Sequence, residues 1–229
     1  MIKPALSFYS AFALLFCFVS CKKGDTSSFQ GTYHSGNSYI VESPVIYTAS
    51  GKITDTALIR QFIDRKSRLG LTYLFLNQST RLNPYSFELR FIDNNKVEIH
   101  DSLAIIPTEI TSTLEDELII TSIDSSAYTP FYPPTRTTQL STDILQIVPN
   151  PVCPTSVLSP KCKYRQSFPV LISGNDLSIP YISYYVVSGS FSSYGRPMAW
   201  NAFNEKGLAN FSTEDTVLIQ MQRLQMIKE

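Results

Sequence analysis

Few side chains in this sequence are spaced for acid–base or metal chemistry. His100, Asp101 and Ser102 are the residue types of a hydrolytic triad, but neighbours on a strand point to opposite faces, so these three cannot form a proton relay. The three carboxylates at 115–117 could bind Ca²⁺, but a calcium site needs about six to eight oxygens from a shaped loop. A solvent-exposed acidic turn is the better explanation for this cluster. The chain also lacks the G-x-S-x-G, H-E-x-x-H, Walker and G-x-G-x-x-G motifs. We therefore predict no catalytic residue, no metal site and no cofactor.

Aromatic residues near the C-terminal third are the better candidates for a binding site. Alternation on a strand puts Tyr181 and Tyr185 on one face and Tyr184 on the other. Rings on an open β surface can stack on sugar rings or apolar ligands, and they lose little entropy on binding. Packing in the core or at a sheet edge is the alternative use of such rings. We mark Tyr184, Tyr194 and Trp200 as candidate ligand-stacking residues.

The first twenty residues have the layout of a secretory signal peptide. Lys3 supplies the positive start, and an uncharged apolar run from Ala11 to Val19 follows it. The run is too short to cross a hydrocarbon core of about 30 Å, which takes about 20 apolar residues as a helix. We predict a signal peptide over residues 1–20, a flexible tether over 21–28 and a single mostly-β domain over 29–229.

The end of this segment resembles the lipobox of bacterial lipoproteins, in which small residues precede the cysteine that is modified. Val19, Ser20 and Cys21 carry the resemblance. It implies cleavage after Ser20, a diacylglyceryl group on the sulfur of Cys21 and an acylated α-amine. One acyl chain binds a bilayer only marginally, whereas two or three on one residue anchor the protein stably. An ordinary secretory signal that leaves Cys21 as a thiol is the alternative.

The residue after the lipobox bears on the location of the protein. Lys22 stands where an Asp retains some lipoproteins at the inner membrane. By the same resemblance, the protein belongs to the cell envelope as an outer-membrane lipoprotein, with its body in the periplasm or at the cell surface. Membrane lipid, reached through acylated Cys21, is then its first partner.

Two cysteines are left once Cys17 is removed with the signal and Cys21 is assigned to lipid. In an oxidising compartment, Cys153 and Cys162 are expected to form a disulfide. The ten-residue loop so closed gives about 2.7 kcal/mol in the chain-entropy model. Two free thiols are the alternative, and a zinc site would need further ligands from the remote His34 and His100.

Charge and composition exclude some partners. The 19 basic and 19 acidic residues cancel, whereas a duplex nucleic-acid binder normally has a basic excess, so we expect no nucleic-acid partner. The 43% of hydrophobic residues is enough to fill a core.

The pattern of the body predicts short strands. We expect them over 39–41, 45–47, 71–76, 87–91, 97–100, 117–123, 144–148, 168–172, 181–187, 198–203 and 217–224. The turn residues at 93–95 predict a hairpin. The segment 217–224 also fits a helical face, but Thr216 and Val217 favour a strand. The fold class is mainly β, an antiparallel sandwich or barrel.

One segment has helical spacing. Apolar residues recur between positions 58 and 63, Thr54 or Asp55 can cap the free N–H groups, and Gly70 can end the helix. We predict one short helix near residues 55–67 that packs on the sheet or plugs a barrel end. The proline-containing segments 125–141 and 149–160 are predicted to be long loops.

Gly31-Thr32-Tyr33 is similar to the Gly-x-Trp motif that opens the first strand of lipocalin-like barrels. The resemblance implies a barrel whose interior takes a small apolar ligand. Our main hypothesis is a lipid-anchored envelope protein with a binding or structural role and no catalysis. The alternatives are a hydrolase acting on polysaccharide and a lipocalin-like carrier.

Overall fold

A computed structural model describes residues 29–65, 80–84, 86–114, 116–128, 135–148, 150–152, 162–189, 191–194 and 199–229. The predicted signal peptide, the tether and the strand over 71–76 lie outside these described residues, as does most of the predicted loop 149–160. Among the helices that are described, none has both the length and the hydropathy needed to span a membrane.

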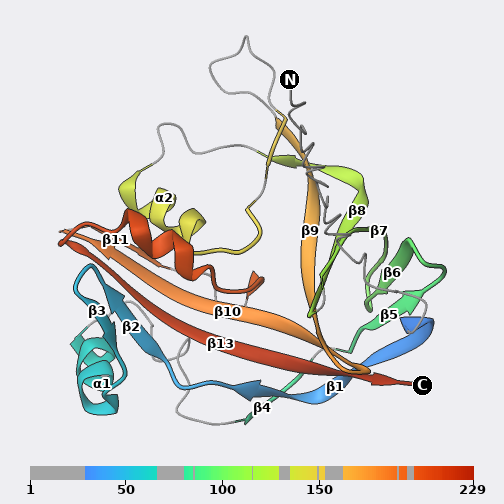
Figure 1. Ribbon diagram of the computed structural model, residues 1–229, viewed down its shortest axis with the longest axis horizontal. Helices are drawn as coiled ribbons and strands as arrows, with labels where there is room; N and C mark the ends of the chain where they lie inside the picture. The colour runs from blue at the N-terminus through green and yellow to red at the C-terminus, as the bar shows by residue number, and fades with distance from the viewer. Residues whose placement is uncertain are drawn as a thin grey trace, which may run out of the picture.

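Eight antiparallel strands form a closed barrel (Figure 1). They are β1 (Gly31–Val41), β5 (Glu88–Phe91), β6 (Lys96–His100), β7 (Ile105–Thr113), β8 (Glu117–Tyr128), β9 (Cys162–Ser173), β10 (Asp176–Ser188) and β13 (Asp215–Lys228). Strands β5 to β10 pair in chain order, and β13 lies between β10 and β1, which pairs back to β5. The prediction of a mainly β fold is confirmed, and the architecture is a barrel.

The predicted hairpin at 93–95 is confirmed and shows why these strands form. Leu89 and Phe91 on β5 are buried while Arg90 between them is exposed, as a half-buried strand requires. The Oδ1 atom of Asp93 accepts hydrogen bonds from the backbone N of Asn95 at 2.8 Å and of Lys96 at 2.9 Å. The side chain thus fixes the turn, and the alternation fixes which face enters the barrel.

The barrel interior is packed with apolar side chains. One cluster contains Phe29, Tyr33, Tyr39, Val41, Leu89, Phe91, Val97, Ile99, Leu118, Ile120, Phe168, Val170, Leu177, Ile179, Leu224 and Met226. Tyr33, the last residue of the Gly31-Thr32-Tyr33 segment, is 2% exposed in this cluster. The described side chains therefore fill the interior from several strands.

The two ends of the barrel differ. At the end that we name the turn end lie the start of β1, the β5–β6 turn and the end of β13. At the opposite end, β9 leaves β10 after pairing over only 171–173 and 176–178. Figure 1 shows β8 and β9 rising as one arm while β10 and β13 run sideways as another. We name this the split end.

Strands β10 and β13 continue past the barrel into a small sheet. It adds β2 (Val45–Thr48), β3 (Gly51–Ile53), β11 (Phe191–Tyr194) and β12 (Ala199–Trp200), while β4 (Thr80–Leu82) pairs with β1. Helix α1 (Thr56–Arg65) buries Ile59 and Ile63 on one face, beside Tyr185 and Leu218. Helix α2 (Arg136–Asp143) and the 3-10 helix η4 (Glu205–Asn210) contribute to the apolar cluster on the other face.

Several boundaries differ from the sequence predictions. The predicted helix over 55–67 is present as α1, where Asp55 accepts from the backbone N of Leu58 at 2.9 Å, and it packs on the sheet. The segment 217–224 is a strand, as predicted. The predicted loop over 125–141 was wrong in part, because β8 runs to Tyr128 and α2 begins at Arg136.

Two predicted strands are also corrected. Residues 144–148 form no strand: Ile144 ends α2, and Leu145 makes only an isolated bridge to Phe203. The strand expected over 198–203 is reduced, among the described residues, to the two-residue β12. Both segments connect other elements and bury apolar residues there. A short apolar run in a buried connecting segment has the same sequence pattern as a strand.

Candidate functional site

Trp200 is placed at the point where β9 and β10 separate. Its backbone pairs with Tyr181 of β10, while its indole Nε1 donates to the carbonyl oxygen of Pro169 on β9 at 2.8 Å. The ring lies 4.7 Å from that of Phe168 and 5.5 Å from that of Phe87, measured between centroids. Trp200 therefore bridges the two arms, and its side chain stays half-buried.

Further aromatic rings meet Trp200 at the split end. The Tyr181 ring lies 6.2 Å from it and 5.4 Å from the edge-on ring of Tyr39. We name Tyr39, Phe87, Phe168, Tyr181 and Trp200 the aromatic group. Burial raises the pKa of the Tyr181 hydroxyl, so this group stays neutral and keeps its proton as a hydrogen-bond donor.

Polar side chains continue the same inward-facing rows. Ser183, Gln220 and Gln222 have 0% of their surface exposed, and we name them the glutamine layer. The layer separates the barrel core, which ends at Leu224 on β13, from the α1 cluster, which begins at Leu218. We did not predict the glutamine layer from the sequence, although positions 218, 220, 222 and 224, which face inward on β13, are Leu, Gln, Gln and Leu.

The hydrogen bonds of the glutamine layer leave one acceptor unused. The Nε2 atom of Gln222 donates to Ser183 Oγ at 3.2 Å, and the Nε2 atom of Gln220 donates to the carbonyl oxygen of Glu42 at 3.1 Å. Within the described part of the chain, Gln222 Oε1 and the Tyr185 hydroxyl are buried with no hydrogen-bond partner. A buried polar atom without a partner is unfavourable, so these atoms mark a place for a further polar group.

The structure separates the three predicted stacking residues. Tyr184 is only 7% exposed and lies in the apolar cluster with Leu140 of α2, so its ring has no open face for a ligand. Tyr194 pairs with Tyr185 at the edge of the small sheet, and its side chain is not described. Trp200 alone of the three is found among other rings at the split end.

The acid–base candidates are used by the fold. His100 Nε2 lies 2.7 Å from Glu98 Oε2, and Asp101 Oδ1 accepts from the backbone of the turn that follows. Glu117 accepts from Gln146, and burial raises the pKa of its carboxyl group. Over the ranges that the structure describes, no three metal-binding side chains come together.

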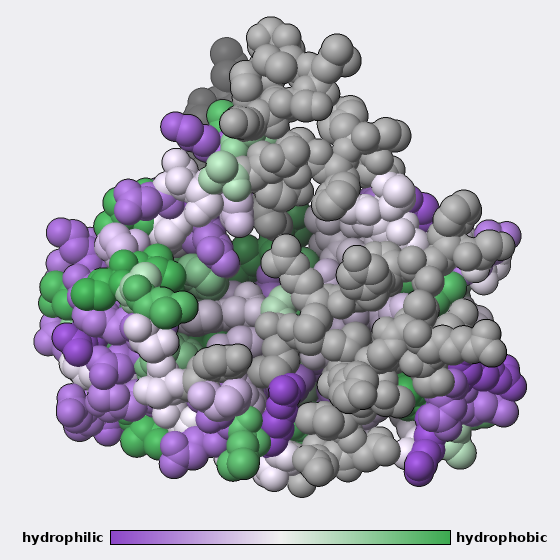
Figure 2. All heavy atoms as spheres, turned by 180° about the vertical axis from the view of Figure 1, so that it is seen from behind, coloured by the Kyte–Doolittle hydropathy of each residue, from purple (hydrophilic) through white to green (hydrophobic). Residues whose placement is uncertain are grey.

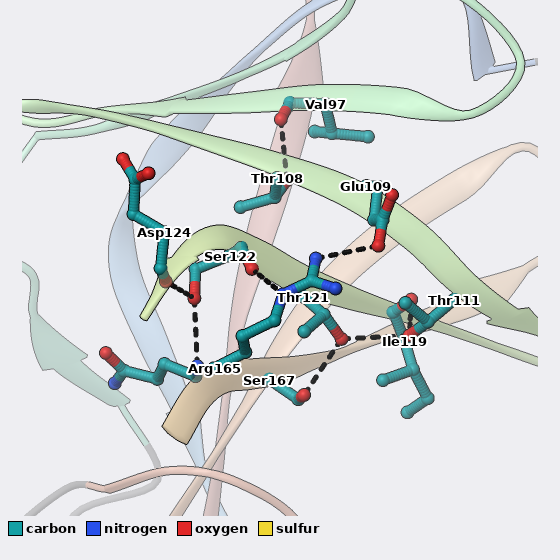
Figure 3. A network of polar contacts seen from close by, with 11 residues as sticks. Val97, Thr108, Glu109, Thr111, Ile119, Thr121, Ser122, Asp124, Arg165 and Ser167 are labelled. Carbon is teal, nitrogen blue, oxygen red and sulfur yellow. Dashed lines mark hydrogen bonds and ion pairs between the residues drawn. The ribbon is translucent and has the colours of Figure 1, made fainter. Parts of the chain in front are cut away.

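A polar network on β7, β8 and β9 has a structural role (Figure 3). The register of β8 against β9 shifts just after Thr121, where β8 bulges. Arg165 donates to the freed carbonyl of Ser122 and, at 2.7 Å, to Glu109, while the hydroxyls of Thr121 and Ser167 are 2.8 Å apart. These contacts provide partners for the backbone groups that the bulge leaves unpaired, and they do not form a binding site.

The predicted disulfide involves one residue that is not described. Cys162 begins β9 and is fully buried, whereas Cys153 lies outside the described residues. Their chain neighbours Val152 and Lys163 exchange two backbone hydrogen bonds of 2.8 and 3.0 Å. This antiparallel pair supports the Cys153–Cys162 bridge, which stays a prediction.

A hollow of about 560 Å³ is open to solvent at the turn end. Its lining residues are Gln30, Gly31, Phe91, Ile92, Asp93, Asn94 and Asn95. Asp93 and the backbone around it are already used by the turn. Figure 2 shows from behind that hydrophobic side chains lie among hydrophilic ones on the described surface. The aromatic group, with half-buried Trp200, makes the split end the better candidate site.

Replacing Trp200 by alanine is expected to destabilise the protein by about 2 kcal/mol, because ring contacts with Phe87, Phe168 and Tyr181 are lost from a half-buried position. Trp200→Phe keeps a smaller ring but loses the hydrogen bond to Pro169 and part of the ring contacts, so about 1 kcal/mol should be lost. Urea unfolding followed by circular dichroism measures both. Equal stability of Trp200→Ala and the wild type would show that the indole does not bridge the arms.

Comparison with protein-family models, with curated proteins and with solved structures found no match for this chain.

Proposed function

We propose that the chain is a lipid-anchored protein of the cell envelope whose barrel binds a small ligand at the split end. The aromatic group, with half-buried Trp200 between the two arms, is the observation that carries the binding role. Aromatic faces beside polar groups suit ligands that have both apolar and hydrogen-bonding parts. The resemblance of residues 19–21 to a lipobox supports the anchor.

The geometry of the chain entry fits this arrangement. Phe29 is buried at the start of the fold and β1 begins at the turn end. The seven residues 22–28 reach at most about 25 Å from Cys21. Strand β13 alone, with its 14 residues, spans about 46 Å. In the proposed protein the turn end is therefore held near the bilayer, and the split end is free to point toward the aqueous side.

The anchor predicts the behaviour of a cysteine variant. In cell fractionation, wild-type protein should sediment with outer membranes and resist a carbonate wash, while Cys21→Ala should leave the membrane fraction because it has no site for acyl chains. Cys17→Ala, whose cysteine lies within the predicted signal peptide, is the matched control and should stay membrane-bound. If Cys21→Ala stayed in the membrane as the wild type does, the proposed anchor would be rejected.

The binding role is tested with the chain's only tryptophan. N-acetylglucosamine supplies a sugar ring with hydroxyl and amide groups, and laurate supplies an apolar chain. Titration of either into the mature protein should change the fluorescence of Trp200 in a saturable way if the split end binds ligands. The absence of any change with both probes up to millimolar concentrations would contradict the proposed binding role.

A carrier that holds an apolar ligand inside the barrel is the second candidate, and the closed eight-stranded barrel favours it. Toward the turn end the described interior is filled by buried side chains such as Leu89, Val97 and Leu177. We therefore place the ligand at the split end, where Trp200 is only half-buried. The hydrolase alternative has no comparable support: the two buried carboxylates of the described chain, Glu117 and Asp215, are each held by a side-chain donor.

A further inference from the structure

We infer that the glutamine layer selects the ligand of the split end, and that this ligand is a small uncharged molecule with a hydroxyl or amide group that donates to Gln222 Oε1. This inference rests on the binding role proposed for the split end. It adds the chemical class of the ligand and the residue that recognises it.

The first support is the position of Gln222. It pairs with Tyr181 of the aromatic group on one side and with Val41 on the other. On β13 it alternates with Leu224 and Met226, which belong to the barrel core, so its side chain lies on the inward face. A ligand that stacks in the aromatic group would therefore reach the amide of Gln222 from the same face.

The second support is the unused acceptor. The Nε2 atom of Gln222 donates to Ser183 Oγ at 3.2 Å, which orients the amide, and Oε1 is left buried without a partner among the described residues. An amide oxygen accepts hydrogen bonds and donates none. The missing group must therefore be a donor, as a hydroxyl or an amide N–H is.

The third support is the absence of buried positive charge. Within the described ranges, no Lys, Arg or His side chain is buried. Arg81 pairs with Tyr39 on β1, but it is half-buried and already has an interaction of its own. A carboxylate brought against Gln222 Oε1 would meet a second acceptor and no buried cation, which is unfavourable. An uncharged donor therefore fits the described residues around Gln222 better than a fatty-acid head group does.

The test compares two glutamines of the same strand. Gln222→Met removes the inward amide at nearly constant volume, and Gln225→Met makes the same change on the opposite, outward-facing row. Binding of N-acetylglucosamine and of laurate is followed through Trp200 fluorescence, and stability through the melting temperature. We expect Gln222→Met to weaken N-acetylglucosamine binding about tenfold while Gln225→Met changes it less than twofold.

The stability readout separates recognition from a structural role. Gln222→Met removes a buried acceptor without a partner and also the hydrogen bond from Nε2 to Ser183 Oγ. These effects oppose each other, so the melting temperature of the ligand-free protein should stay within about 2–4 °C of the wild-type value. Unchanged N-acetylglucosamine binding in Gln222→Met, or tighter binding of laurate than of N-acetylglucosamine by the wild type, would overturn this inference and leave the binding role standing. A wild type that responds to neither probe would instead reject the proposed function itself.

Discussion

Replacing Gly207 by alanine is expected to lower the free energy of unfolding by about 3 kcal/mol, the upper range for overpacking a well-packed site. A Cβ atom at this position would lie 2.0 Å from the carbonyl oxygen of Asp143 and 3.0 Å from the backbone N of Ile144. Both are backbone atoms at the end of α2 and cannot rotate away. One of the two segments would have to move.

The close approach is fixed by hydrogen bonds between η4 and α2. Asn204 donates from Nδ2 to the Asp143 carbonyl at 3.1 Å and from its backbone N to the Ile144 carbonyl at 2.8 Å. Moving the backbone would weaken these bonds and the apolar cluster beneath them, to which Leu140 and Ile144 belong. A single added methyl group is therefore expected to disturb the packing of both α2 and η4 on this face of the small sheet.

Urea unfolding of Gly207→Ala measures the effect, and Gly174→Ala is the matched control. Gly174 has a positive φ of 62° but open space around its Cβ position, so its replacement should cost only about 1 kcal/mol from backbone strain. Equal losses in the two variants would show that the contact between η4 and α2 is not as close as described.

Replacing Asp215 by alanine is the second large change, with an expected loss of about 3 kcal/mol. Asp215 is fully buried, and its Oδ2 atom accepts from Arg136 Nη2 at 2.6 Å, from Ser212 N at 2.7 Å and from Ser212 Oγ at 2.9 Å. Truncation removes all three bonds and leaves Arg136 without its partner. Because Arg136 is 37% exposed, water can solvate it in part, which keeps the loss at the lower end for broken buried ion pairs.

The same carboxylate predicts a pH dependence of stability. Burial alone would raise the pKa of Asp215, but hydrogen bonding by Arg136, Ser188 and Ser212 outweighs it and lowers the pKa from 3.8 to about 2. A folded-state pKa below the unfolded one stabilises the protein above about pH 4, and this contribution is lost as the pH falls toward 2. Asp215→Asn should lack this part of the acid sensitivity, while Glu214→Gln, at an exposed neighbour, should keep it. Identical acid unfolding of Asp215→Asn and the wild type would contradict the assignment.

The parts of the fold that local chemistry determines were predictable from the sequence. The alternation around Leu89 and the turn chemistry of Asp93 specified the β5–β6 hairpin, and Asp55 specified the start of α1. These features depend on residues only a few positions apart. The register of a strand or the cap of a helix can then be deduced without the rest of the chain.

The parts that depend on distant contacts were not predictable. Helix α2 was missed because its sequence contains three Thr residues and little apolar surface, and its cap is Thr135, whose Oγ1 accepts from Thr138 N at 3.2 Å. Its stability comes from Leu140 packing beneath it and from η4, about 65 residues later. The separation of β9 from β10 has no local signal either, since it depends on Trp200 reaching Pro169.

The candidate site, like the fold, could be predicted only in part from the sequence. Trp200 and the two faces of the strand with Tyr181, Tyr184 and Tyr185 were identified from residue type and alternation. The sequence did not indicate which face of that strand is covered, because the burial of Tyr184 in the cluster with Leu140 of α2 depends on the fold. The glutamine layer was missed because Gln at an inward strand position is indistinguishable from Gln at an outward one until the barrel closes.

The intact mass of the mature protein, extracted from membranes with detergent, decides whether the barrel is attached to lipid. We expect a chain that begins at Cys21 and carries a diacylglyceryl group, with a further acyl chain on the α-amine. A mature chain whose Cys21 has no lipid, or one that still contains residues 1–20, would contradict it.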